Sequence, residues 1–227
     1  GDVFIDENLA QQICIVDGVN AYIYNYFTGN LTVQTLTIPP FGAIPSYSLI
    51  PSYVCYHNTF FLIGSAPNNP QFKSAWYTFI TDPLDADKIK YNTQHLLQTK
   101  PDYALAVQRL PSRGNNVLVL GNTVAEVWTQ VGGKENYRRN SSFNIDSGIV
   151  VTSTIASSEQ YLCYLAQNEN NAPYIMMTNG SENKRISNDG IDNLLGRIKF
   201  PSNSNAFFYR QDGHLFYQLT FFNPVDN

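Results

Sequence analysis

Charged residues are scarce in this sequence, and the small number of basic residues limits the classes of partner. Charged residues make up 14% of the 227 residues, whereas a typical soluble domain has about a quarter. Lysine and arginine total 14 against 18 acidic residues, which gives a formal net charge of −4. A free-standing nucleic-acid binder needs clustered cations to neutralise phosphates. We therefore expect the partners to be proteins or glycans.

Long apolar segments and an even set of cysteines are also missing. No apolar run approaches the roughly 20 residues that cross a bilayer, and the opening GDVFIDENLAQQ lacks the basic and apolar regions of a signal peptide. We therefore expect a soluble chain with no membrane partner. The three cysteines lie inside apolar, strand-like runs, which predicts reduced core thiols rather than a disulfide. They are Cys14, Cys55 and Cys163.

Aromatic residues and turn-forming pairs are abundant by contrast. Tyrosine and phenylalanine number 15 and 14, and 43% of the residues are hydrophobic, enough to bury a sizeable core. Apolar and β-branched runs are separated by pairs such as Asp17-Gly18, which are typical of β-hairpins. Turns of this kind recur at intervals of roughly 40 to 65 residues, near the repeat length of propeller blades. They lie at Asp17, His57, Gly121, Asn168 and Asp212.

This spacing predicts an all-β, β-propeller-like fold. Antiparallel blades of three to four strands would pack face to face around an axis. A two-sheet sandwich is the main alternative, but it does not require the longer period. No low-complexity linker divides the chain, so we expect residues 1–227 to form a single β-propeller-like domain.

Two segments have a helical pattern, so we expect one or two short helices beside the strands. Residues 85–98 have a weak pattern, with three apolar side chains in a polar context. Residues 187–198 have a stronger one, because Ser187 or Asn188 can cap the first turn and Asp189 favours its positive end. The apolar side chains that share one face of this helix are Ile191, Leu194, Leu195 and Ile198. We expect this helix to lie across a sheet edge.

No arrangement of residues indicates catalysis, so we predict no enzyme and no catalytic, metal or cofactor-binding residues. A glycine-rich phosphate loop and a nucleophile elbow are missing. The histidines lack the spacing of a metal site; they are His57, His95 and His214. Residues 82–87 could offer oxygen ligands to calcium, but they lack the glycine and distal glutamate of a helix–loop–helix site. We interpret this acidic run as a solvated loop; its carboxylates are Asp82, Asp85 and Asp87.

The strongest local positive charge lies in GGKENYRR, residues 132–139. Its cations are Lys134, Arg138 and Arg139. We interpret the segment as a flexible loop and as the candidate electrostatic contact with an acidic partner surface or with DNA. Trp76 and Trp128 lie within strand-like runs, which favours packing in the core over stacking on a sugar.

The order of three motifs points to a known family. In SAWYTFITDPLDADKIKYNTQHLLQTKPDYALAVQRLPSRGNNVLVLGNTVAEVWTQVGG, a strand ends at Asp82, a Lys100-Pro101-Asp102 step follows, and an apolar hairpin ends in Glu126-Val127-Trp128. Then come NGSENKRISNDGIDNLLGRI and the aromatic hairpin AFFYRQDGHLFYQLTFF. From about residue 12 to residue 222 the sequence resembles the packaged-DNA stabilisation proteins, which are the tail hub or tail accessory factors of short-tailed bacteriophages.

The resemblance implies a structural protein of the virion tail, assembled in the host cytoplasm. Such a protein is a tail hub component that closes the portal channel and stabilises packaged DNA. The implied partners are other phage tail and portal-adaptor proteins, further copies in a homo-oligomeric ring, and packaged DNA through non-specific contact. The resemblance implies no cofactor. Family members are considerably longer, so we expect this chain to be a fragment of a longer protein.

A different function remains open from the fold alone, namely a glycan-binding or glycan-cleaving β-propeller (a lectin or glycosidase). Such a protein should present a pocket with clustered carboxylates or an exposed tryptophan near the propeller axis. A tail hub should instead have broad lateral faces. The positions of the tryptophans and carboxylates therefore distinguish the two.

Overall fold

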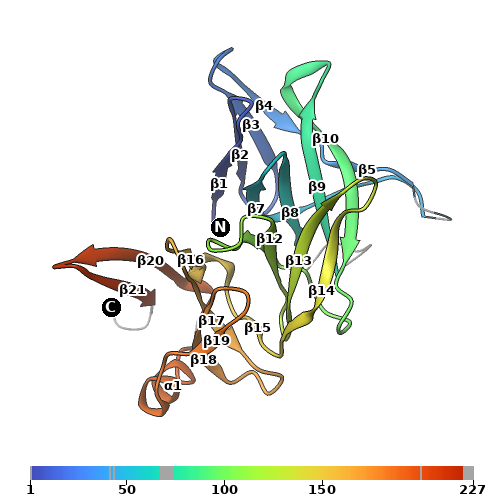
Figure 1. The fold of residues 1–227 in the computed structure, drawn as a ribbon. Coiled ribbons are helices and arrows are strands. Elements are labelled where there is room, and N and C mark those ends of the chain that lie inside the picture. The colour runs from blue at the N-terminus through green and yellow to red at the C-terminus, as the bar shows by residue number, and fades with distance from the viewer. Residues whose placement is uncertain (1, 41, 43, 67–73, 200, 222–227) are drawn as a thin grey trace.

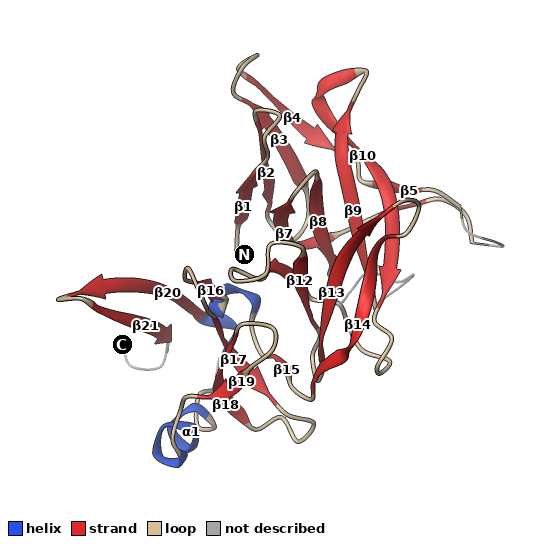
Figure 2. Ribbon diagram, viewed as in Figure 1, coloured by secondary structure: helices blue, strands red, loops and turns tan. Residues whose placement is uncertain are grey.

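The computed structural model describes residues 2–40, 42, 44–66, 74–199 and 201–221, and its elements are almost all strands (Figure 2). Three sheets of four antiparallel strands are followed by a fourth sheet of five strands and by a two-stranded hairpin. Each sheet is built from consecutive segments of the chain, as in propeller blades. The predicted all-β, propeller-like fold of antiparallel blades is confirmed.

In the first sheet, buried and half-buried residues alternate along the two central strands, because successive side chains of a strand point to opposite faces. Cys14 and Val16 on one strand and Ala21 and Ile23 on the next are buried on the same face. The predicted turn at Asp17 joins these strands, and the Asp17 side chain accepts hydrogen bonds from the next backbone N–H groups. The strands are β1 (Phe4–Glu7), β2 (Gln12–Val16), β3 (Ala21–Asn25) and β4 (Asn30–Gln34). The short β1 was not predicted.

The second sheet corrects one of the two predicted helices. Residues 85–96 form a strand that pairs with its neighbour over most of its length, and less exposed and more exposed residues alternate along most of it. A small two-stranded ladder of β5 (Thr37–Ile38) and β6 (Tyr47–Ser48) precedes the sheet. The strands of the second sheet are β7 (Pro51–His57), β8 (Phe60–Ser65), β9 (Ala75–Asp82) and β10 (Asp85–Leu96).

The third and fourth sheets follow the hairpins that the sequence indicates. The third contains β11 (Ala106–Arg109), β12 (Asn116–Leu120), β13 (Ala125–Gly132) and β14 (Asn136–Ile145). The fourth contains β15 (Gly148–Ile149), the 3-10 turn η1 (Thr152–Thr154), β16 (Ala156–Ser157), β17 (Leu162–Gln167), β18 (Pro173–Thr178) and β19 (Asn183–Arg185). Both β15 and β16 pair with β17.

One predicted helix is present, and a hairpin follows it. In α1 (Asp189–Leu195) the Asn188 side chain accepts a hydrogen bond from the Ile191 N–H and caps the first turn. The helix packs on β18, but the predicted apolar face is only partly used. Leu195 is buried, whereas Ile191 and Leu194 are exposed. After η2 (Pro201–Asn203), the hairpin of β20 (Ser204–Gln211) and β21 (His214–Phe221) turns at Asp212-Gly213.

Successive sheets pack on one another in chain order, from blue to orange in Figure 1. Strand β7 contacts β1 and β11, so the first strands of neighbouring sheets lie side by side, while the outer strand β10 contacts β3 and β4. Hairpin strand β20 lies against β16 in the same manner. The hairpin therefore packs against the fourth sheet, where side chains of β21 join its buried apolar cluster. Four buried apolar clusters fill the spaces between sheets.

The three cysteines are buried and free, as predicted. Burial raises the pKa of the Cys55 and Cys163 thiols to about 12, so these side chains act as small apolar groups in the core. None of the helices in the described part of the chain is long and apolar enough to span a bilayer.

Candidate functional site

The three basic residues predicted as a partner contact lie on the third sheet. Lys134 lies in the turn between β13 and β14, whereas Arg138 and Arg139 lie within β14. The interpretation of this segment as a flexible loop is wrong for the two arginines, because they pair in register with Thr129 and Trp128 of β13. All three cations line the same cavity. The structure thus brings the predicted residues together.

This cavity, here called the basic pocket, encloses about 530 Å³ where β10 of the second sheet meets β13 and β14 of the third. Its deepest side chains are His95, Trp128 and Tyr137, each less than a tenth exposed. Arg138 is mostly exposed, and Arg139 is mostly buried. The pocket therefore has an aromatic floor and a positively charged rim.

Two of the three cations have acidic partners. Arg138 Nη2 lies 3.1 Å from the Glu135 Oε2 atom, and Arg139 Nε lies 3.6 Å from Glu126 Oε1. Lys134 forms no ion pair with any residue that the structure describes. Three cations and two carboxylates leave a net positive charge at the pocket, in a protein that is negative as a whole.

The floor of the pocket belongs to a tight aromatic cluster. The His95 ring stacks on Trp76 with a centroid distance of 4.4 Å, and Trp76 meets Trp128 edge to face at 5.5 Å. Both tryptophans are buried, which confirms the prediction that they pack in the core. They offer no exposed platform for a sugar. Within the described residues, His95 Nε2 has no hydrogen-bond partner.

Burial of His95 has a consequence for stability at low pH. Desolvation lowers the pKa of His95 to about 4, below the value of about 6.5 for a histidine in an unfolded chain. Between these values only the unfolded chain binds the proton, so stability falls as the pH falls. We expect the free energy of unfolding to drop by about 2 kcal/mol from this group between pH 7 and pH 5.

Urea unfolding of the wild type and of His95→Phe at both pH values measures this contribution. The variant should lose about 2 kcal/mol less than the wild type on acidification. His214→Phe, at an exposed position on the hairpin, serves as the matched control and should keep the wild-type dependence. Equal pH dependence in all three proteins would contradict the buried, neutral state of His95.

Glu126, part of the Glu-Val-Trp motif, holds the neighbouring chain segments in place. Its carboxylate is fully buried and accepts hydrogen bonds from the backbone N–H groups of Gln98 and Thr99 and from Trp128 Nε1. With the Arg139 guanidinium nearby, the charge is compensated. The segment after β10 is thereby tied to β13. The role of this motif residue is structural.

Asp102, from the Lys-Pro-Asp step, has a similar role. Its Oδ2 atom accepts hydrogen bonds from the Thr123 N–H at 2.6 Å and from the Val124 N–H at 3.2 Å. These bonds fix the turn between β12 and β13 that the sequence placed at Gly121. Both acidic motif residues therefore serve the fold of the third sheet.

The carboxylates of the acidic run and the three histidines lie apart and make contacts within the fold. Asp87 accepts hydrogen bonds from the side chains of Thr28 and Asn30 in the first sheet, and Asp85 pairs with Lys88. The run forms the β9–β10 turn and the start of β10, not a separate loop. Among the residues that the structure describes, no three His, Cys, Asp or Glu side chains are grouped so that they could hold a metal ion.

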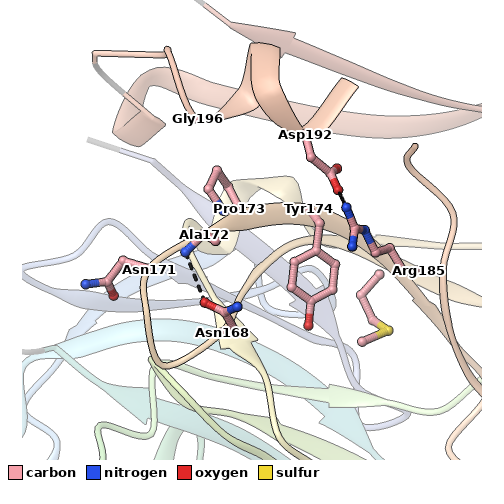
Figure 3. A pocket seen from close by; sticks show the side chains of 9 residues that line it. Asn168, Asn171, Ala172, Pro173, Tyr174, Arg185, Asp192 and Gly196 are labelled. Carbon is pink, nitrogen blue, oxygen red and sulfur yellow. Dashed lines mark hydrogen bonds and ion pairs between the residues drawn. The ribbon is translucent and has the colours of Figure 1, made fainter. Parts of the chain in front are cut away.

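A second cavity, of about 600 Å³, lies beside α1 on the fourth sheet (Figure 3). Arg185 pairs with Asp192 across it, and its guanidinium lies 5.7 Å from the centroid of the Tyr174 ring. The Asn168 side chain accepts a hydrogen bond from the Ala172 N–H and closes its own loop. Most polar side chains that line this cavity therefore bind one another. Asp192 carries the single carboxylate among the lining residues.

The first sheet has one face packed against the second sheet and one open face. Successive side chains of a strand point to opposite faces, so the open face carries two rows of residues that pair across the four strands. Its residues are Ile5, Glu7, Ile13, Ile15, Tyr22, Tyr24, Leu31 and Val33. Ile5, Leu31 and Val33 are each more than 60% exposed. An apolar sheet face of this extent is typical of a surface that another element covers.

Comparison with known proteins agrees with this architecture. The family model described as "Bacteriophage P22 Gp10, beta-propeller" (Phage_stabilise) matches residues 3–222. No curated protein matches the sequence.

Three similar solved structures have low sequence identity to this chain. The N-terminal domain of Nup159 is 11% identical with a TM-score of 0.43, covering 100% of this chain and 54% of that one. The yeast Nup82–Nup159–Nup116 complex is 14% identical with a TM-score of 0.34, covering 77% of this chain and 42% of that one. KlHsv2 with a Gly-Ser linker in place of one loop is 15% identical with a TM-score of 0.36, covering 77% of this chain and 47% of that one. The chain thus spans about half the length of the structures it matches.

Proposed function

Because this chain belongs to the bacteriophage P22 Gp10 β-propeller family of phage stabilisation proteins, we propose that it is a tail hub component that closes the portal channel and stabilises packaged DNA. The protein acts by resisting force rather than by chemistry. It sits in the virion tail after assembly in the host cytoplasm, within a homo-oligomeric ring. Residues 1–227 form a single β-propeller-like domain within a longer protein.

The observation that carries this proposal is the family match over residues 3–222 on a fold of packed sheets. The residues that might have indicated another function are used within that fold. Glu126 and Asp102 bind backbone N–H groups, and both tryptophans lie in the core. This favours the structural role over a glycan-binding or glycan-cleaving propeller, and over catalysis in general.

The open face of the first sheet supports assembly into a ring. Inside the chain, the equivalent faces of the later sheets are each covered by the preceding sheet, with apolar side chains buried between the two. We propose that a sheet outside these residues covers the open face, and that in the ring this sheet belongs to the neighbouring copy. Exposed apolar residues such as Leu31 and Val33 would be buried there, each contributing on the order of 1.5 to 3 kcal/mol.

Co-sedimentation with the portal–adaptor assembly of the phage that carries the gene tests the tail-hub function. We expect the protein to sediment with that assembly as a multi-copy complex of defined mass. A protein that stays monomeric and ignores the assembly would overturn the proposal. Glycan screening would then be the next experiment.

The double variant Leu31→Lys/Val33→Lys tests the ring contact. Both residues are exposed, so the variant should fold, but burying two lysines in the contact should weaken self-association at least tenfold. Mass photometry over a range of concentrations measures this change. Leu84→Lys, at a 92% exposed position in the β9–β10 turn, is the matched control and should assemble as the wild type does. Equal association of the two variants would exclude the open face as the contact.

A further inference from the structure

The basic pocket contains cationic donors that acidic side chains do not fully satisfy. Lys134 has no acidic partner among the described residues, and Arg139 Nε is buried without a hydrogen bond, although Glu126 lies 3.6 Å away. The buried Nε2 atom of His95, which donates or accepts according to the tautomer, also lacks a hydrogen-bond partner. The two nearby carboxylates are already engaged, Glu135 by Arg138 and Glu126 by backbone and indole N–H groups. Buried donors of this kind are normally satisfied.

We propose that the basic pocket binds a carboxylate group, namely the side chain of a glutamate or aspartate presented by a partner protein. A carboxylate has the charge and the acceptor oxygens that the rim lacks, and Arg and Lys bind it through short, charge-assisted hydrogen bonds. Its aliphatic stem would pack on the aromatic floor formed by Trp128 and Tyr137. The inference rests on the proposed function only for the source of the carboxylate, a neighbouring tail protein.

The shape and charge of the pocket favour a protein carboxylate over the phosphates of DNA. DNA binding uses a row of cations along a groove or surface, each neutralising one phosphate. Here a single uncompensated lysine lies beside a cavity of about 530 Å³, so the positive charge is local and does not form a row. The net charge of the whole chain is −4, so long-range attraction to DNA is lacking.

Histidine NMR signals can report occupation of the pocket directly, because the chain has only three histidines. We would titrate the full 227-residue chain with N-acetyl-glutamate methylamide and follow the His95 ring signals. N-acetyl-glutamine methylamide, which is neutral and nearly the same size, is the control probe. We expect a saturable shift of the His95 signals with the glutamate compound and none with the glutamine compound.

Lys134→Met should raise the dissociation constant of the glutamate compound about three- to fivefold, as expected for loss of one partly exposed ion pair. Lys184→Met, at an exposed position on β19, should leave it unchanged. The proposal fails if His95 does not respond, if both compounds shift it equally, or if a short DNA duplex shifts it at lower concentration than the glutamate compound. None of these results depends on co-sedimentation with the portal–adaptor assembly, so this inference and the proposed function can fail separately.

Discussion

Gly148→Ala should destabilise the protein by about 3 kcal/mol or more, because there is no room for a side chain at this position. A Cβ atom on Gly148 would lie 2.1 Å from the carbonyl carbon of Asn122 and 2.3 Å from the backbone nitrogen of Thr123. Both contacts are with backbone atoms, which no rotamer change can move. The fourth sheet begins at Gly148 and meets the turn of the third sheet here. The substitution would therefore push two sheets apart.

Thermal unfolding gives the size of this effect. A loss of 3 kcal/mol corresponds to a decrease in Tm of roughly 6 to 12 °C for a chain of this length. Gly114→Ala is the matched control, since a Cβ atom there would meet nothing within 4 Å and the φ angle is not positive. We expect the control to stay within about 0.5 kcal/mol of the wild type. Equal Tm values for the two variants would show that the sheets do not approach so closely.

Glu126→Ala should cost about 3 to 5 kcal/mol, the range found when one member of a buried ionic network is removed. The variant leaves the N–H groups of Gln98 and Thr99 and the Trp128 indole without their acceptor. It also leaves the mostly buried Arg139 without its carboxylate. Urea unfolding monitored by tryptophan fluorescence suits this test, because Trp128 lies at the altered site.

A second variant of Glu126 separates the effect of its hydrogen bonds from that of its charge, and a variant of Glu135 serves as the control. Glu126→Gln retains one acceptor oxygen, so its loss of stability should be smaller than that of Glu126→Ala. Glu135→Ala removes an exposed glutamate that pairs with Arg138, and such pairs contribute about 0 to 1 kcal/mol. If Glu126→Ala were no more destabilising than Glu135→Ala, the structural role assigned to the Glu-Val-Trp motif would be wrong.

The turns and inner strands of the fold can be predicted from the sequence because their signals are local. Asp17-Gly18 and Asp212-Gly213 require positive φ, and the structure has φ of 83° at Gly18 and 51° at Asp212. Aspartate and glycine tolerate such angles, so these pairs identify hairpins without knowledge of the rest of the chain. The helix start at Asn188 is equally local, since the capping residue needs only the N–H groups of the next turn.

The outer strands could not be predicted in the same way. Strands β10 and β14 contain mainly polar residues, because only part of their surface faces a neighbouring sheet. The Ile89 and Leu96 spacing of β10 resembled a weak helix, and Arg138 and Arg139 of β14 resembled a loop. Both segments are strands because β10 pairs with β9 and β14 pairs with β13. Hydrophobic periodicity does not encode this pairing.

Prediction of the basic pocket from the sequence was limited for the same reason. The cations of the basic pocket could be selected from the sequence because they are close together in it. His95 and the aromatic floor could not, since β10 and β14 are separated by several strands and meet only when the second and third sheets pack. Asp102 and Glu126 were noted as motif residues, but the sequence gives no sign of the backbone groups that they bind.

Retention of packaged DNA is the most direct test of the tail-hub function. Phage particles would be assembled without this protein in the phage that carries its gene, and the nuclease-resistant DNA per particle would be measured. We predict that the particles lose their DNA and that adding the purified protein before nuclease treatment restores retention. Particles that keep a full complement of DNA without the protein would show that it is not needed to stabilise packaged DNA.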